Sequence, residues 1–274
     1  IKNVKFLIKN KVKIYRDLEL YSKLIKSEKV IAITGTNGKS TTTKLIGDII
    51  TSHKKKCFVG GNIGKPLIDF VKLRNNLRYH VIELSSFQLE SAPNFNSYVS
   101  ILLNISKDHL DRHGSMTSYI NEKIKILNNN KNKYNIISVD DVYCKKIFNT
   151  LKKLNTVPIS IVKPLRKGIY FNNNAIYDNY FYKSKIIKIN KFSNSLNSFF
   201  NLQNILAAYA VCVILKLDLK IFINKIANFK GLSHRFEKVL DNSKLLIINN
   251  SKATNLDSLL KSISGNMNIF LILG

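Results

Sequence analysis

Residues 35–40 (GTNGKS) combine the residue types that bind phosphate groups. Glycines let the backbone turn so that successive N–H groups converge on phosphate oxygens, and a following helix N-terminus adds partial positive charge. The Lys39 ammonium can reach the outer phosphates of a nucleoside triphosphate, and the Ser40 hydroxyl can bind Mg²⁺. The usual phosphate-binding loop (P-loop) has four residues between its first glycine and the Gly-Lys pair, whereas this segment has the shorter Gly-x-x-Gly-Lys-Ser form. The alternative interpretation is a chance glycine turn.

The elements predicted around this segment favour phosphate binding over a chance turn. The β-branched run Lys29–Thr34 predicts a buried strand, and residues 42–50 predict a helix. A strand, a glycine turn and a helix in this order form the opening of an α/β unit.

Three other side chains could belong to a metal or catalytic site. Glu83 ends the β-rich run 79–84, and a carboxylate at the carboxyl end of a strand beside the P-loop strand can be a second Mg²⁺ ligand. The alternative is a glutamate that begins a helix. His109 follows the β-rich run 98–105, although a lone histidine is more often structural. Lys123 lies in a predicted helix, where a lysine is nearly always on the solvated surface.

The remaining segments predict an α/β fold. Further strands, antiparallel hairpins and helices are expected, in order, at residues 18–25 (helix), 134–139 and 157–161 (strands), 168–190 (hairpins), 199–215 (helix), 244–249 (strand), 255–264 (helix) and 268–273 (strand). Residues 4–8 are apolar, and residues 128–133 predict a surface loop. We therefore predict a P-loop-type, mostly parallel central sheet flanked by helices, with a small antiparallel sub-sheet and the start of another β-α-β unit.

The chain is strongly basic, with 44 Lys+Arg against 17 Asp+Glu in 274 residues and a formal net charge of +27. Such a charge is typical of nucleic-acid-binding proteins. Only six of the basic residues are arginine, however, and arginine is favoured in backbone and base recognition. Lysine, asparagine and isoleucine share A/T-rich codons and are all abundant. We interpret the charge as compositional drift and predict no nucleic-acid partner, with a polyanion-binding surface as the alternative.

Composition also bears on the class of protein. At 45% hydrophobic and 22% charged residues, the chain can bury a core, which excludes global disorder. The longest apolar run, residues 205–215, is too short to span a bilayer, so no membrane insertion is expected. Cys57, Cys144 and Cys212 fit neither a disulfide framework nor a CxxC metal site and indicate a reducing cytoplasm. Because the chain begins with isoleucine and stops after an apolar run, we expect a fragment of a longer protein.

Several segments resemble the Mur ligases of peptidoglycan synthesis. Residues 34–41 (TGTNGKST) are similar to the ATP loop of that family. Segments similar to its D-glutamate-adding members are residues 60–64 (GGNIG), 83–90 (ELSSFQLE), 104–112 (NISKDHLDR), 231–237 (GLSHRFE) and 251–255 (SKATN). The second and last of these are specific, because the sister ligases carry other sequences there. The resemblance runs in order over about residues 12–274.

This resemblance implies three regions and an activity. Residues 1–28 would be a remnant of an N-terminal UDP-binding domain and linker, residues 29–230 a central ATP-binding domain, and residues 231–274 the truncated start of a Rossmann-like domain. The implied enzyme is a cytoplasmic, monomeric, ATP- and Mg²⁺-dependent ligase. It would add D-glutamate to UDP-N-acetylmuramoyl-L-alanine through an acyl phosphate. The D-glutamate pocket would lie mostly outside this chain, so the fragment alone should not complete ligation.

The resemblance also implies roles for individual residues. Lys39, Glu83, His109 and Lys123 would be catalytic. Ser40 and Glu83 would bind one Mg²⁺ and His109 a second, with Lys123 as a further ligand if CO₂ carbamylates it. Asn62 and Ser86 would contact the muramoyl substrate. The ATP-binding residues would be Gly35, Thr36, Asn37, Gly38, Lys39, Ser40, Thr41, Thr42, Asn201, Arg235, Asn250 and Lys252.

Two positions differ from the family pattern. Phe200 replaces a histidine at the start of the interdomain helix, and Asn250 replaces an aspartate whose carboxylate contacts nucleotide. We therefore expect weaker ATP binding than in a typical member. Two alternatives remain: a folylpolyglutamate synthase-like amide ligase, and a degenerate nucleotide-binding remnant without activity.

Overall fold

The computed structural model describes residues 9–73, 77–127, 132–151, 155–242, 244–253, 255–263 and 268–272. The strands are β1 (Lys29–Thr34), β2 (Cys57–Gly61), β3 (Tyr79–Glu83), β4 (Val99–Leu102), β5 (Tyr134–Ser138), β6 (Thr156–Ser160), β7 (Ile169–Asn172), β8 (Ala175–Asp178), β9 (Lys185–Lys188), β10 (Glu237–Asp241) and β11 (Leu246–Asn249). The first nine form one sheet in the order β2-β3-β1-β4-β5-β6-β7-β8-β9, and β10 pairs with β11. Neighbours from β2 to β7 are parallel, whereas β8 and β9 are antiparallel additions to the same sheet.

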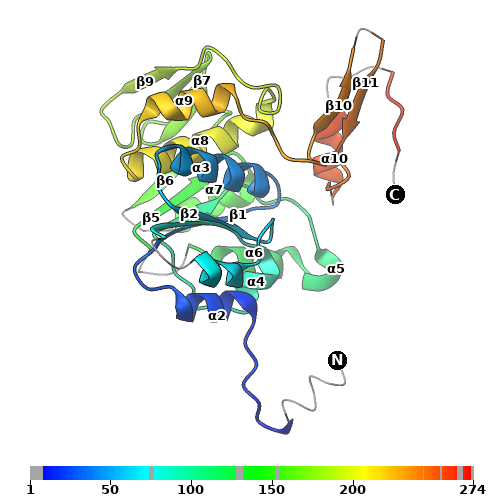
Figure 1. Ribbon diagram of the computed structural model, residues 1–274. Coiled ribbons are helices and arrows are strands. Elements are labelled where there is room, and N and C mark those ends of the chain that lie inside the picture. The colour runs from blue at the N-terminus through cyan, green and yellow to red at the C-terminus, as the bar shows by residue number, and fades with distance from the viewer. Residues whose placement is uncertain are drawn as a thin grey trace.

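Helices cover both faces of this sheet (Figure 1). They are α2 (Asp17–Leu24), α3 (Lys39–Ser52), the 3₁₀ helix η1 (Leu67–Leu73), α4 (Ser86–Glu90), α5 (Leu110–His113), α6 (Met116–Ile124), α7 (Val142–Thr150), α8 (Phe199–Ile214), α9 (Leu219–Ala227) and α10 (Leu256–Ile263). In Figure 1, α3, α8 and α9 lie above the sheet, and α2, α4 and α6 lie below it. The predicted α/β class is therefore confirmed. Within the described ranges, no helix is long and apolar enough to cross a membrane.

The P-loop strand β1 is buried on both faces. Ile31 and Ile33 belong to the apolar cluster that includes α3 and α8, and Val30 and Ala32 belong to the cluster on the opposite face. Alternate residues of a strand point to opposite faces, so a parallel strand covered on both sides is mostly apolar. The chain crosses from β3 past β1 to β4, so the strand order reverses beside β1. Ligands of such sheets bind at the carboxyl ends of the strands at this reversal.

One predicted strand is wrong. The described part of the run 268–273, residues 268–272, forms no strand, and Asn268 has a φ of +54°. A strand requires a neighbour to satisfy its N–H and C=O groups. The neighbour of β11 is instead β10, and the two form an antiparallel hairpin. Residues 1–8 and most of the predicted loop at 128–133 lie outside the described residues.

A buried histidine joins α2 to the sheet. The His80 side chain on β3 is fully buried, and its Nδ1 lies 2.7 Å from Tyr21 Oη on α2. The rings of Phe58 and Phe70 lie 5.5 and 5.1 Å from the imidazole. Burial lowers the pKa of His80 to about 4, although the nearby Glu28 carboxylate partly opposes this effect.

We expect His80 to make the fold sensitive to acid. Its folded-state pKa lies below the value of about 6.5 in an unfolded chain, so the unfolded state gains a proton first as the pH falls. The free energy of unfolding should therefore fall by about 3 kcal/mol between pH 6.5 and 4 from this group. The Tyr21→Phe/His80→Phe variant should lack this contribution to the fall in the free energy of unfolding. Chemical denaturation of both proteins across this range measures the difference, and identical pH profiles would contradict the assignment.

Candidate nucleotide and metal site

The P-loop connects β1 to α3. Gly38 precedes α3 with φ +84°, a left-handed conformation that favours glycine. The Lys39 ammonium donates hydrogen bonds to the carbonyl oxygens of Gly35 (3.0 Å) and Thr36 (2.7 Å), so it lies against the loop. Burial lowers the pKa of Lys39, and the Glu83 carboxylate partly offsets this effect. The loop therefore has the glycine turn and the adjacent lysine that are typical of phosphate-binding loops.

Glu83 lies next to the P-loop because β3 pairs with β1, with Glu83 opposite Ile33. Its carboxylate is fully buried and accepts hydrogen bonds from Ser40 Oγ (2.7 Å) and Asn62 Nδ2 (3.1 Å). The prediction that Glu83 ends a strand is confirmed, and the helix-start alternative is wrong. The hydroxyl and carboxylate oxygens are the kind of ligands that Mg²⁺ prefers, so Ser40 and Glu83 together fit one ion. Asn62, expected near the substrate, lies at this same pair.

Lys123 is buried, contrary to the solvated position that is usual for a helical lysine. Only 2% of the residue is exposed, and its Nζ donates a hydrogen bond to the carbonyl oxygen of Gly35 (2.8 Å). Burial lowers its pKa well below the usual value, and the neighbouring Lys39 ammonium lowers it further. A larger share of this amine is therefore neutral than in a surface lysine.

His109 lies at the start of α5 with φ +51°. Its side chain is 41% exposed, with Nε2 3.6 Å from the Asp108 carboxylate and its ring 5.2 Å from Phe87. Across the described residues, no group of three or more His, Cys, Asp and Glu side chains could hold a metal ion. The structure therefore brings together the predicted ligands Ser40 and Glu83, but it turns His109 towards Asp108 and Lys123 towards Gly35.

A cavity of about 320 Å³ lies beside the P-loop. Its walls come from the P-loop, the ends of β4, β5 and β6, the start of α8, and residues 229–236. The rings of Phe200 and Phe236 meet edge to face at 6.1 Å on the cavity wall. Six of the residues predicted to bind ATP line the cavity: Asn37, Gly38, Thr41, Asn201, Arg235 and Asn250.

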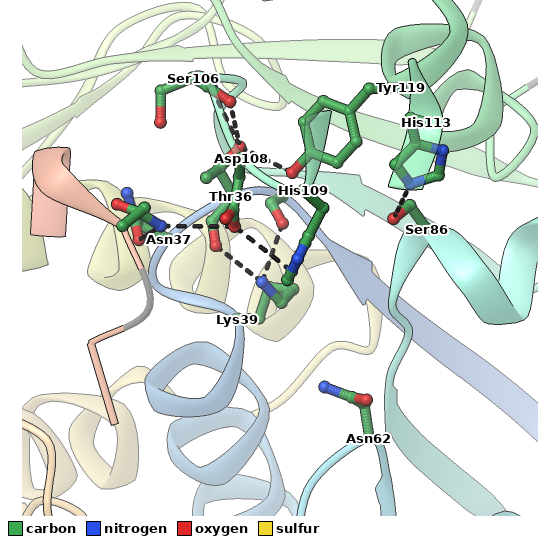
Figure 2. Close-up of polar contacts among 12 residues, drawn as sticks. Thr36, Asn37, Lys39, Asn62, Ser86, Ser106, Asp108, His109, His113 and Tyr119 are labelled. Atoms are coloured by element: carbon green, nitrogen blue, oxygen red, sulfur yellow. Dashed lines mark hydrogen bonds and ion pairs between the residues drawn. The ribbon is translucent and has the colours of Figure 1, made fainter. Parts of the chain in front are cut away.

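Two residues predicted to bind ATP, Thr36 and Thr42, have side chains that hydrogen-bond within the protein. The Thr36 hydroxyl accepts a hydrogen bond from the backbone N–H of Ser106 and contacts Tyr119 Oη at 3.1 Å (Figure 2). The Thr42 hydroxyl donates to Asn204 Oδ1 (3.0 Å). Both side chains therefore fix the shape of the site.

Two more predicted residues lie away from the cavity. Ser86, expected at the substrate, is buried, and its Oγ lies 2.9 Å from His113 Nε2 (Figure 2). Lys252, expected at the nucleotide, is exposed, and its backbone N–H donates to the carbonyl oxygen of His234.

A network of side-chain amides connects the P-loop to α8. Asn104 Oδ1 accepts the backbone N–H of Asn37 (2.8 Å), and Asn104 Nδ2 donates to the Asn37 carbonyl oxygen (3.1 Å) and to Gln203 Oε1 (2.8 Å). Asn204 Nδ2 donates to Asn201 Oδ1 (2.9 Å). The sequence reasoning missed the roles of Gln203 and Asn204. A signal was present, because the amides of α8 are gathered in its first six residues and the rest of the helix is largely apolar.

Comparison with known proteins identifies the family to which the chain is similar. A family profile described as "Mur ligase middle domain" matches residues 33–212. The chain is 40% identical over 268 residues to the UDP-N-acetylmuramoylalanine–D-glutamate ligase of Rickettsia prowazekii, covering 96% of this chain and 58% of the relative. It is 38% identical over 260 residues to the protein of the same name from Clostridioides difficile, covering 94% of this chain and 57% of the relative. The chain thus spans less than two thirds of these relatives.

Solved structures share the fold at lower sequence identity. A crystal structure of MurF from Acinetobacter baumannii matches with a TM-score of 0.68 at 20% identity, covering 89% of this chain and 55% of that one. A pseudomurein peptide ligase type C from Methanothermus fervidus matches with a TM-score of 0.63 at 21% identity, covering 96% and 62%.

Proposed function

The chain belongs to the Mur ligase family, and from this premise we propose that it is the ATP-binding part of an enzyme that joins D-glutamate to UDP-N-acetylmuramoyl-L-alanine. The names of the relatives support these substrates. The observation that carries the proposal is the buried Ser40–Glu83 pair at the P-loop, next to a cavity large enough for a nucleoside. Because the relatives are longer, we assign the complete reaction to a protein that includes the remaining domains.

The nucleotide would lie along the P-loop and the cavity. Its phosphates would contact the loop N–H groups and Lys39, with Mg²⁺ held by Ser40 and Glu83. Its nucleoside would occupy the cavity, where Phe200 and Phe236 offer an aromatic wall. Phe200 stands where the family has histidine, and either ring can pack against a base, so this change is compatible with binding.

The chain's own residues would then orient and stabilise phosphoryl transfer. The alanyl carboxylate of the substrate attacks the γ-phosphorus, which gives an acyl phosphate and ADP. The amine of D-glutamate attacks the carbonyl carbon and loses a proton, and phosphate leaves from the tetrahedral intermediate. Lys39 and the loop N–H groups stabilise charge on the transferring group, and Mg²⁺ neutralises phosphate oxygens when bound.

The buried amine of Lys123 favours a covalent modification. A neutral amine can attack CO₂ and release a proton, which gives a carbamate with anionic oxygens. Burial lowers the pKa of this amine and so increases the share of neutral amine that can react. We propose that this carbamate serves as an additional Mg²⁺ ligand. A ¹³C-carbamate signal in protein equilibrated with ¹³C-bicarbonate, lost in Lys123→Met, would support the modification, and its absence from both proteins would exclude it.

A phosphate-release assay tests the proposed reaction. The full-length protein is incubated with MgATP and UDP-N-acetylmuramoyl-L-alanine, with and without D-glutamate. Release that depends on D-glutamate supports the ligase. No release at any ATP concentration supports a degenerate remnant instead.

We expect the Asn250→Asp substitution to lower the KM for ATP in the full-length enzyme by roughly threefold to tenfold, because a carboxylate forms stronger hydrogen bonds with the nucleotide than an amide does. Asn250 Oδ1 accepts the backbone N–H of Phe236 (3.1 Å), and an aspartate can preserve this contact. Steady-state kinetics at saturating second substrates measure the effect. Asn242→Asp, in the exposed turn between β10 and β11, is the charge control and should leave KM unchanged. An unchanged KM in Asn250→Asp would show that this position does not limit ATP binding.

A further inference from the structure

The C-terminal segment, defined here as Phe236, β10, β11, Asn255 and α10, contacts the rest of the chain on two sides of the nucleotide site. On one side, Phe236 meets Phe200 of α8 at the cavity wall. On the other side, Asn255 reaches the P-loop, immediately before α10 begins. In Figure 2 the salmon ribbon of this segment passes beside Asn37. The second contact has no role in the chemistry described above.

Asn255 contacts two groups that lie in the loops after two different strands of the central sheet, β1 and β4. Its Nδ2 lies 3.4 Å from Oδ1 of Asn37 in the P-loop and 3.4 Å from Oδ2 of Asp108 in the segment after β4. These hydrogen bonds are long, but the amide carries two N–H groups and one acceptor is a carboxylate, which strengthens the interaction. Asn255 therefore joins the C-terminal segment to the phosphate-binding loop and to the segment after β4.

The two acceptors are themselves held in place. Asn104 fixes the backbone of Asn37 through its N–H and carbonyl groups, so Asn255 holds the side chain of a loop residue whose main chain is already fixed. The Asp108 side chain is only 7% exposed. Its carboxylate lies near the ammonium groups of Lys39 and Lys123 and opposes the lowering of their pKa values. The position of the C-terminal segment is thus linked to the most highly charged part of the site.

We propose that Asn255 is a positioning residue that couples the C-terminal segment to the phosphate-binding loop. By donating its side-chain amide to Asn37 and Asp108, it holds this segment over the loop, so that nucleotide binding depends on the segment's position. The proposal deepens the proposed nucleotide site and rests on it. The contact itself, however, can be tested without nucleotide.

The first test measures the position of the segment in the full chain. Spin labels are attached at Ile186→Cys on β9 and Val239→Cys on β10, both exposed positions. Burial raises the pKa of Cys57 to about 12, and Cys144 and Cys212 are buried, so the new thiols should react selectively. Pulsed electron paramagnetic resonance then gives the distance distribution between the labels.

Asn255→Asp places a second carboxylate against Asp108, and like charges at this separation repel. We expect a broader and longer distance distribution than in the wild type. Asn255→Ala should broaden it less, because it removes the contact without adding repulsion. The exchange variant Asp108→Asn/Asn255→Asp restores one amide and one carboxylate and should recover the wild-type distribution. Asn242→Asp adds the same charge to the same segment away from the loop, and it should change nothing. A distribution in Asn255→Asp identical to that of the wild type would overturn the contact.

The second test measures MgATP binding to the same proteins by calorimetry. Asn255→Asp should bind about tenfold more weakly than Asn242→Asp, within the usual range for coupling between two sites. Equal affinities, with a changed label distance, would overturn the coupling. Failure of the wild type and Asn242→Asp to bind MgATP would instead refute the proposed function, while the label distances still decide whether Asn255 holds the segment.

Discussion

Replacing Gly38 with alanine is expected to weaken MgATP binding by roughly a hundredfold, because a displacement of about 1 Å in the loop is enough to misalign its phosphate contacts. The φ of +84° is unfavourable for alanine, and the added Cβ would lie 2.3 Å from Asn204 Oδ1. Asn204 cannot move without loss, since its Oδ1 accepts from Thr42 and its Nδ2 donates to Asn201. The loop must therefore shift, or two buried hydrogen bonds must break.

Gly114→Ala is the matched control for this prediction. Gly114 also has a positive φ, +74°, but an added Cβ would meet no atom within 4 Å. The Gly114→Ala variant should therefore lose only about 1 kcal/mol of stability, from backbone strain, and should bind MgATP normally. Calorimetric titration and thermal unfolding of both variants separate strain from the clash. Equal loss of binding in both would show that the Asn204 contact is unimportant.

Replacing Lys123 with methionine is expected to reduce turnover of the full-length enzyme by at least roughly a hundredfold while leaving the fold as stable as before or more stable. Lys123 Nζ holds the Gly35 carbonyl oxygen and is the proposed site of carbamylation, and methionine can do neither. Methionine does, however, fill the same buried space without a charge. Turnover should therefore fall while the stability of the fold is kept or increased.

The pH dependence of stability gives a second readout for Lys123. Its folded-state pKa is lower than in the unfolded chain, so between these two values the unfolded state binds the additional proton. In CO₂-free buffer, where the amine is unmodified, wild-type stability should rise with pH between these two pKa values, and Lys123→Met should lack this rise. Lys125→Met, two residues further along, is the control. It should keep the wild-type turnover and the increase in stability with pH. A large drop in the unfolding temperature of Lys123→Met would contradict the assignment.

Short-range patterns were sufficient to predict much of the scaffold. The run Lys29–Thr34 is β1 with the predicted bounds, because consecutive β-branched and apolar residues define a strand buried on both faces. The unpaired stretch at residues 268–272 shows the limit of this reasoning. Its apolar pattern suits a strand, but strand formation also depends on a neighbour that the local sequence does not specify.

By itself, the sequence determined the P-loop, the strand that ends in Glu83 and the α/β class, since glycine conformation and apolar periodicity act over a few residues. The tertiary structure alone decided which side chains meet. The pairing of β1 with β3 brings Glu83 to Ser40, the packing of α6 buries Lys123, and the return of the C-terminal segment brings Asn255 to Asn37. Burial and hydrogen-bond partners come from residues far apart in the chain. The chemical state of a lysine or an asparagine therefore follows from the assembled fold and not from its neighbours in sequence.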